Sequence, residues 1–232
     1  MKRLRSTNKN PKCDPADAKR IVIVDDHPLF RKGLEQLIHS DGTFAVCGEA
    51  GSAAEAMDVI RKLDPDLAIV DVSLPGANGI ELIKNIRAEF PKLPILVLSM
   101  HDESLYALRA LRAGAQGYVM KQEALANVVQ AIHEVFSGRP YLSPAMAAQV
   151  ITNFAQTPSE GEADVIDRLS DRELEILELI GKGNEVRQIG KLLHLSPKTV
   201  ETHRAHIKEK LNLASAHQVG RFAVQWLDAR GI

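Results

Sequence analysis

The stretch IVDVSLPGANGIEL, residues 69–82, decides the fold of this chain. It is an apolar run that ends in one carboxylate, Asp71, and continues into a Pro/Gly-rich loop and the start of an amphipathic segment. A second apolar run, IVIV at 21–24, ends in the pair Asp25 and Asp26. Runs of β-branched residues between helical patterns are typical of buried parallel strands. Because ligands bind at the carboxyl ends of such strands, we expect these three carboxylates to meet at one edge of a sheet.

A cluster of this kind needs a cation. Each pair of carboxylates repels by roughly 4 kcal/mol at about 4 Å, for an effective dielectric constant near 20. The two natural candidates are a hard divalent metal ion and a lysine. Lys121, at the end of a later apolar run, supplies the lysine.

Strand and helix patterns alternate five times between residues 20 and 137. This spacing predicts an α/β domain with a five-stranded, doubly wound parallel sheet that carries helices on both faces. Pro65, Pro91 and Pro94 precede strands, which fits this assignment. The predicted strands are 21–25, 43–49, 66–71, 94–99 and 115–120, and the predicted helices are about 28–39, 53–63, 79–90, 103–113 and 122–137.

The C-terminal part of the chain has a different pattern. One more helix is predicted at about 144–154, and 155–167 has the composition of a linker. Four helical patterns follow from 169 onward. Ser170 and Glu173 form a capping-box pattern, Asn184 is the expected cap of a short second helix, and Ser196 with Pro197 starts the third. Two short helices joined by a tight turn predict a small all-α helix-turn-helix domain, with domain bounds at 20–137, 138–167 and 168–232.

Composition agrees with two domains in 232 residues, of which 45% are hydrophobic and 25% charged. The net charge of −1 divides into +5 for residues 1–20, −9 for 21–167 and +3 for 168–232. No apolar run approaches the ~20 residues of a membrane span, and the basic N-terminal extension 1–19 lacks the apolar region of a secretory signal. Cys13 and Cys47 lie far apart without ligand spacing, so we expect a cytoplasmic protein without a disulfide or zinc.

Five positions at predicted strand ends carry a resemblance to a known family. Asp25-Asp26, Asp71, Ser99 and Lys121 match the signature of two-component receiver domains, over about residues 20–137. The strings LSMHD at 98–102 and GYVMK at 117–121 are similar to the subfamily with a LuxR-type C-terminal domain (NarL/FixJ-like). The resemblance implies a flavodoxin-like fold and a bacterial response regulator that a sensor histidine kinase phosphorylates.

The resemblance also implies a role for each residue of the pocket. Asp71 would be the phosphoacceptor, Ser99 and Lys121 would bind the phosphoryl group, and Tyr118 would be an aromatic switch that rotates inward on phosphorylation. Mg²⁺ would be the cofactor, because it prefers oxygen ligands; those implied here are Asp25, Asp26, Asp71 and the Ser73 carbonyl.

Simpler interpretations of these residues stay open. An isolated Asp is most often a turn or capping carboxylate, and Tyr118 fits a plain half-buried strand residue nearly as well. His27 and His101 border the pocket without a ligand spacing, so we expect loop histidines. A phosphatase of the haloacid dehalogenase type would need a second carboxylate two residues after its nucleophile. That position is Ser73, so we expect a stoichiometric switch and no turnover enzyme.

The segments RLSDRELEILELI and IGKLLHLSPKTVETHRAHIKEKL resemble the LuxR-type helix-turn-helix domain. In the third helix, 3.6-residue spacing places Val200, His203, Ile207 and Leu211 on one inward face. The N-terminal half of a recognition helix enters the major groove, so we expect Glu201, Thr202 and Ala205 nearest base edges. The full set of predicted contacts to double-stranded promoter DNA is Lys198, Thr199, Glu201, Thr202, Arg204, Ala205, Lys208 and Lys210.

One departure from the family concerns the second helix. Glu185-Val186 stands where most LuxR-type domains carry a Ser/Thr-Asn pair, which puts DNA contacts from this helix in doubt. A helical bundle for protein contacts is the alternative. The family implies a homodimer after phosphorylation and a receiver that covers the recognition helix before it. The charge division suggests that an acidic receiver surface faces a basic DNA-binding one.

Overall fold

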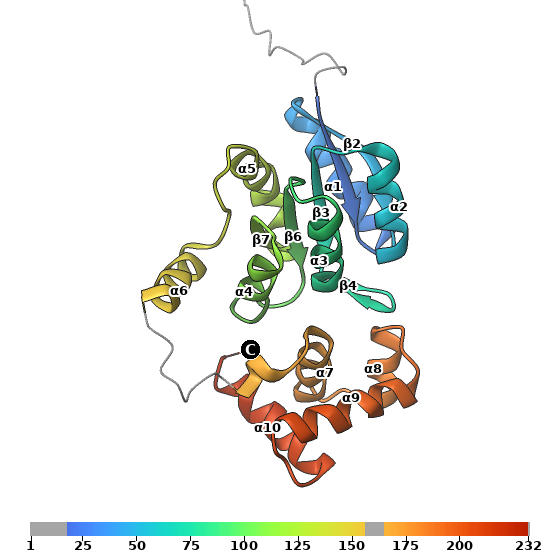
Figure 1. Ribbon diagram of the computed structural model, residues 1–232, viewed down its shortest axis with the longest axis vertical. Coiled ribbons are helices and arrows are strands. Elements are labelled where there is room, and N and C mark those ends of the chain that lie inside the picture. Colours follow the sequence, from blue (N-terminus) through green and yellow to red (C-terminus); the bar gives the residue numbers. More distant parts are fainter. Residues whose placement is uncertain (1–17, 156–164, 232) are drawn as a thin grey trace, which may run out of the picture.

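The computed structural model describes residues 18–155 and 165–231. The basic N-terminal extension with Cys13 and most of the predicted linker lie outside these residues. The described part forms an α/β domain followed by a smaller helical domain, joined through a helix at the side (Figure 1). The predicted fold classes, an α/β domain with helices on both faces of its sheet and a small all-α domain, are therefore confirmed.

The α/β domain is built on a five-stranded parallel sheet with the order β2-β1-β3-β6-β7. This is a doubly wound order, and the direction of winding reverses between β1 and β3. Each apolar run that was predicted as a strand forms a strand, and the observed strand ends lie within three residues of the predicted ends. The strands are β1 Lys19–Val24, β2 Phe44–Ala50, β3 Leu67–Asp71, β6 Ile95–Ser99 and β7 Gly117–Met120.

Helices cover both faces of this sheet (Figure 1). Successive residues of the buried strands point to opposite faces, so Ile21 and Ile23 belong to one core while Val22 and Val24 belong to the other. The first core packs under α1 and α5, and the second packs under α2, α3 and α4. The bounds are α1 Pro28–Asp41, α2 Ala53–Leu63, α3 Gly79–Glu89, α4 Glu103–Ala113 and α5 Ala124–Phe136.

Two local features follow the carboxyl ends of strands. A hairpin of β4, Ser73–Leu74, and β5, Ala77–Asn78, follows β3, and the sequence pattern did not predict it. Gly79 begins α3 so close to β3 that a Cβ there would overlap the Asp71 carbonyl oxygen. After β7, residues Lys121–Glu123 form a 3-10 turn, η1, before α5 begins. Both turns hold pocket residues at the sheet edge.

The helical domain contains η2, Val165–Arg168, and four α-helices, and the predicted helix at 144–154 is α6, Pro144–Ala155. Ser170 and Glu173 form the predicted capping box, and Ser196 caps a helix that has Pro197 in its first turn. The predicted Asn184 cap is wrong. Glu185 occupies the N-cap position, while the Asn184 amide donates to the Leu179 carbonyl at 3.0 Å. The four helices are α7 Asp171–Gly181, α8 Val186–Leu192, α9 Pro197–Lys210 and α10 Ala216–Asp228.

The core of this domain uses the predicted inward face of α9. Val200 and Ile207 are fully buried there, beside Val219 and Trp226 of α10. His203 shares this face but is only half-buried. Among the described residues, no helix combines the length and the apolar character that crossing a membrane requires.

Candidate functional site

Three carboxylates and one lysine converge where the sheet reverses its winding. Asp25 follows β1 and Asp71 ends β3, and both are 2% exposed. Lys121, directly after β7, places its Nζ 2.6 Å from an oxygen of Asp25 and 2.6 Å from an oxygen of Asp71. The lysine therefore lies between the two buried carboxylates, and it is one of the two cations that the sequence predicted for this cluster.

The positive charge of Lys121 does not fully offset the burial of the carboxylates in this pocket. Burial raises the pKa of Asp71 to about 6, and Asp25 adds to that rise, although Lys121 opposes it. Burial alone would lower the pKa of Lys121, but the charges of Asp71 and Asp25 raise it above its ordinary value. The ionised form of Asp71 is thus favoured by any further positive charge that enters the pocket.

The donor atoms of the pocket fit a hard divalent cation. Asp25, Asp26, His27 and Asp71 can each bring one ligand atom into a common site. Asp26 is 21% exposed and opens the site to solvent, and the His27 ring touches both neighbouring carboxylates, at 2.6 Å for Asp26 and 3.3 Å for Asp25. The His27 side chain is 67% exposed, so it can move aside. Three carboxylate oxygens and room for water suit Mg²⁺.

Ser99 and Tyr118 extend the pocket toward the loop after β6. Ser99 is fully buried, and its hydroxyl oxygen accepts a hydrogen bond from the His101 amide at 3.1 Å. Tyr118 is 1% exposed and donates its hydroxyl to the His101 carbonyl at 2.9 Å. Burial raises the pKa of the phenol well above its ordinary value, which keeps it a donor. The interpretation of Tyr118 as a half-buried strand residue is therefore wrong, because its ring lies inside.

The expectation that His101 is an ordinary loop histidine is also wrong. Its side chain is only 11% exposed, and its Nδ1 lies 2.9 Å from Oε2 of Glu178 in α7. Nε2 lies 2.7 Å from the Ser73 hydroxyl and 3.7 Å from Glu175. Burial opposes the charged imidazole, but hydrogen bonds to Glu175 and Glu178 outweigh it and raise the pKa of His101 to about 9. His101 is thus a charged contact between the two domains.

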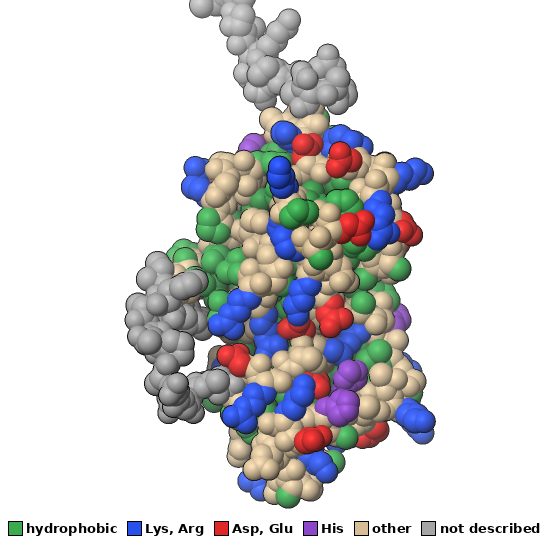
Figure 2. Space-filling view, viewed as in Figure 1, with side chains coloured by type: hydrophobic (Ala, Val, Ile, Leu, Met, Phe, Trp, Pro, Cys, Tyr) green, Lys and Arg blue, Asp and Glu red, His purple; other side chains and the backbone are tan. Residues whose placement is uncertain are grey.

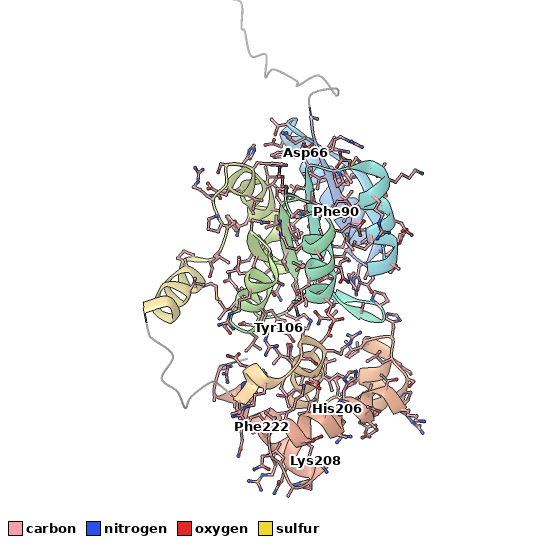
Figure 3. The ribbon with its side chains drawn as sticks, in the orientation of Figure 1. Asp66, Phe90, Tyr106, His206, Lys208 and Phe222 are labelled. Carbon is pink, nitrogen blue, oxygen red and sulfur yellow. The ribbon has the colours of Figure 1, made fainter. Side chains whose placement is uncertain are left out.

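We call the surface where α7 meets the α/β domain the docking interface. It comprises His101, Tyr106 and Arg109 of the β6–α4 region, Ser73, Asn78 and Lys84 of the β4–α3 region, and Asp171, Glu175 and Glu178 of α7. Figure 3 labels Tyr106 at the end of the α/β domain that faces the helical domain. Figure 2 shows basic and acidic side chains together at this level.

The charges of the docking interface have the opposite arrangement to the one expected. Arg109 and Lys84 of the α/β domain both pair with Asp171, at 3.1 and 2.9 Å. Arg109 also donates to the carbonyl oxygens of Leu169 and Ile166, each at 2.8 Å. The net charge of each domain therefore does not describe its contact surface, because the basic groups that pair with Asp171 across the interface come from the acidic domain.

The outward face of α9 is open to solvent. Lys198, Glu201, Thr202 and Ala205 are exposed, so the expectation that the receiver covers this helix is wrong for the docked arrangement. The docking interface uses α7 instead.

The other residues predicted to contact DNA are half-buried or already bonded to a neighbouring side chain. Thr199 is half-buried and bonded to Ser196, Lys208 is half-buried, Arg204 pairs with Glu201 at 3.0 Å, and Lys210 pairs with Glu173 at 2.6 Å.

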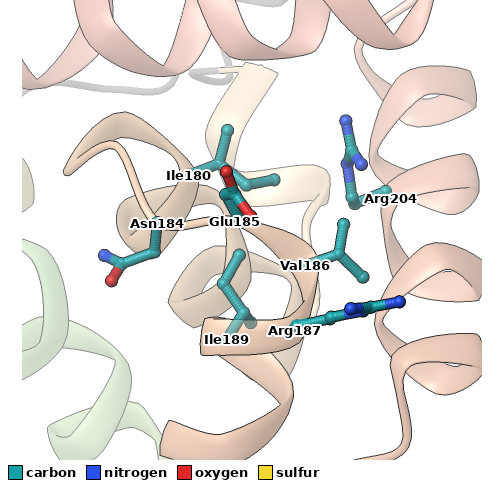
Figure 4. A pocket seen from close by; sticks show the side chains of 7 residues that line it. All are labelled: Ile180, Asn184, Glu185, Val186, Arg187, Ile189 and Arg204. Atoms are coloured by element: carbon teal, nitrogen blue, oxygen red, sulfur yellow. The ribbon is translucent and has the colours of Figure 1, made fainter.

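The start of α8 forms a hollow whose lining Figure 4 shows. Its volume is about 400 Å³, and Arg204 of α9 borders it. Val186 is half-buried against the domain core, while Glu185 and Arg187 are exposed. The Glu185 amide donates to the Gln188 side chain at 2.7 Å, so the unusual Glu-Val pair still begins a capped helix.

Comparison with known proteins gives the class of this chain. Residues 21–133 match the family described as "Response regulator receiver domain", and residues 167–223 match "Bacterial regulatory proteins, luxR family". These two domains define a response regulator with a DNA-binding domain of the LuxR type. The chain belongs to the NarL/FixJ family of two-component response regulators, which are transcription regulators.

Relatives and solved structures agree over nearly the whole chain. It is 35% identical over 206 residues to the response regulator GacA of Pseudomonas viridiflava, which covers 89% of this chain and 95% of that protein. It is 34% identical over 210 residues to the oxygen regulatory protein NreC of Staphylococcus carnosus, covering 89% and 97%. RcsB of Salmonella enterica serovar Typhimurium, solved on promoter rprA with the phosphomimetic BeF3-, has a TM-score of 0.60 at 27% identity, covering 89% and 98%.

Proposed function

We propose that a sensor histidine kinase phosphorylates this regulator on Asp71, with Mg²⁺ as cofactor, and that the chain then regulates transcription as a homodimer on promoter DNA. The observation that supports this most directly is the position of Lys121 between the buried Asp25 and Asp71. A carboxylate whose charge is held at a sheet edge by one lysine is suited to accept a phosphoryl group there.

The reaction uses few groups of the chain. An oxygen of Asp71 attacks phosphorus as the bond to the histidine nitrogen of the kinase breaks, which gives an acyl phosphate and a free imidazole. Lys121 places its positive charge beside the phosphoryl oxygens, and Ser99 offers a hydroxyl from the neighbouring strand end. Asp25, Asp26, Asp71 and the Ser73 carbonyl would hold Mg²⁺, which supplies positive charge for phosphoryl transfer when bound.

Labelling with acetyl phosphate tests this proposal. Asp71→Asn should abolish incorporation, because an amide cannot form the acyl phosphate. Asp58→Asn, at an 80% exposed position of α2, is the matched control and should label as the unchanged chain does. Removal of divalent metal should stop labelling, and Asp26→Asn should raise the Mg²⁺ concentration required. Undiminished labelling of Asp71→Asn would exclude Asp71 as the phosphoacceptor.

DNA binding is supported by the open face of α9. Its basic residues can contact phosphates, and Glu201, Thr202 and Ala205 are placed to reach base edges. Retention on DNA that falls steeply with salt would support this role. A domain that serves only for protein contacts would show no such retention.

A further inference from the structure

A second group of metal-ligand side chains lies inside the DNA-binding domain. Glu173 of α7 and His203 and His206 of α9 can each offer one ligand atom, and these atoms all lie within 4.8 Å of one another. The two histidines are three residues apart, so they are neighbours on one side of the helix. The three residues therefore come from two helices, α7 and α9, and an ion bound by all of them would link these helices.

The three side chains are available for coordination in different ways. His203 Nδ1 is buried and has no hydrogen-bond partner, which is a costly state for a polar atom. The Glu173 side chain is 4% exposed, and its bonds from Lys210 and the Ser170 amide both go to Oε2. Its other oxygen, Oε1, faces His206 Nδ1 at 3.7 Å. Two ligands at about 2.0–2.1 Å from a tetrahedral ion are separated by only slightly less.

We propose that Glu173, His203 and His206 form a binding site for one divalent transition-metal ion of the zinc class. Two imidazole nitrogens and one carboxylate oxygen suit Zn²⁺ better than Mg²⁺, which prefers oxygen alone. Three protein ligands leave a fourth position for water. The His206 side chain is 53% exposed, so this position can be reached from solvent.

The side chains around the proposed metal site determine what changes in the domain when the metal ion binds. Burial lowers the pKa of His203, and Arg172, His206 and Lys210 lower it further while Glu173 opposes them. Lys210 already forms an ion pair with Glu173, and its side chain is 38% exposed. A bound divalent cation would therefore repel the Lys210 ammonium group toward solvent. Metal binding would then fix α7 to α9 and release one lysine of the recognition helix.

Metal titration of the full, tag-free chain tests the site. The buffer contains excess Mg²⁺ to saturate the acidic pocket of the receiver, and Zn²⁺ is measured by competition with a chromophoric chelator. One Zn²⁺ should bind per chain. His206→Ala should weaken binding by at least about tenfold, since even the loss of an outer partner costs that much. His217→Ala, at an exposed position of α10, should have no effect.

Two further measurements separate coordination from a structural role of these residues. Co²⁺ should give the visible absorption of a four-coordinate ion in the unchanged chain and lose it in His206→Ala and in Glu173→Gln, whose folding is checked by circular dichroism. Lys210→Ala should bind Zn²⁺ several-fold more tightly, because the competing ammonium is gone. Absence of stoichiometric Zn²⁺ binding, or equal binding by His206→Ala and His217→Ala, would overturn the proposal.

Discussion

Glu178 Oε2 lies 2.9 Å from His101 Nδ1 and 2.9 Å from the Tyr106 hydroxyl. One carboxylate of the DNA-binding domain thus contacts both the loop after the Ser99 strand and the first part of α4. Its burial would raise the pKa of Glu178, but His101 and Lys182 outweigh burial and lower that pKa to about 2. The two domains are therefore joined by ionised groups that are 1% and 11% exposed, and both carry charge at neutral pH.

Neutralising this carboxylate should loosen the docked arrangement. Glu178→Gln removes the nearer anion from the charged His101, and breaking one side of a buried ion pair typically costs about 3–5 kcal/mol. We expect the two domains to tumble more independently, as measured by 15N relaxation. Glu209→Gln, an exposed glutamate of α9, is the control and should leave relaxation unchanged. Equal relaxation in the two variants would show that other contacts hold the interface.

Removing Lys121 should destabilise the receiver. Lys121→Ala leaves two buried carboxylates without their cation, and we expect a loss of about 3–5 kcal/mol in the free energy of unfolding. The double variant Lys121→Ala/Asp71→Asn should recover part of this loss, because only one carboxylate then remains charged. Urea denaturation of the full cycle measures the coupling. Additive effects of the two changes would contradict a direct interaction.

Substitutions on α9 should separate sequence preference from general affinity. Thr202→Ala or Glu201→Gln should relax preference at one or two base pairs, each worth about 1–3 kcal/mol. Lys198→Ala should weaken all DNA sequences alike and reduce the salt slope by about one unit. Selection from randomised DNA, followed by titration at fixed salt, distinguishes them. A uniform loss from the changes at 201 and 202 would place another face of α9 in the groove.

A fragment of about residues 165–231 should bind a single half-site nearly as well as the unphosphorylated full chain. The reason is that the docking interface covers α7 and leaves the outward face of α9 exposed. Phosphorylation would then act mainly through dimerisation on paired half-sites. Gel-shift titrations on one and on two half-sites at the same salt measure this. Much weaker half-site binding by the full chain would mean that the receiver body blocks DNA sterically.

Local patterns predicted most of the two folds. Alternating apolar runs located all five strands of the sheet, because period and burial are visible within a few residues. Ser170 and Ser196 marked two helix starts through their capping chemistry. The hairpin at Ser73–Leu74 was missed because two-residue strands carry no periodicity.

The contacts between domains could not be predicted in this way. His101 and Glu178 are 77 positions apart, and nothing near either residue signals the other. Their pairing depends on how two finished domains meet. Net charge was misleading for the same reason, since the acidic domain contributes Lys84 and Arg109 to the docking interface. The pocket was predictable because the sheet alone brings its strand ends together.

Ser73 takes part in the pocket and in the docking interface at once. Its amide donates to Asp71 at 3.2 Å, while its hydroxyl lies 2.7 Å from the His101 ring and 3.5 Å from Glu175. Thermodynamic linkage is reciprocal, so an occupant of the pocket that shifts Ser73 alters docking by the same factor by which docking alters the affinity for that occupant. On the proposed function, promoter DNA that draws the C-terminal domain away would thereby change the affinity of the pocket for Mg²⁺. On the same proposed function, a receiver built in this way would answer to an occupied promoter as well as to its kinase.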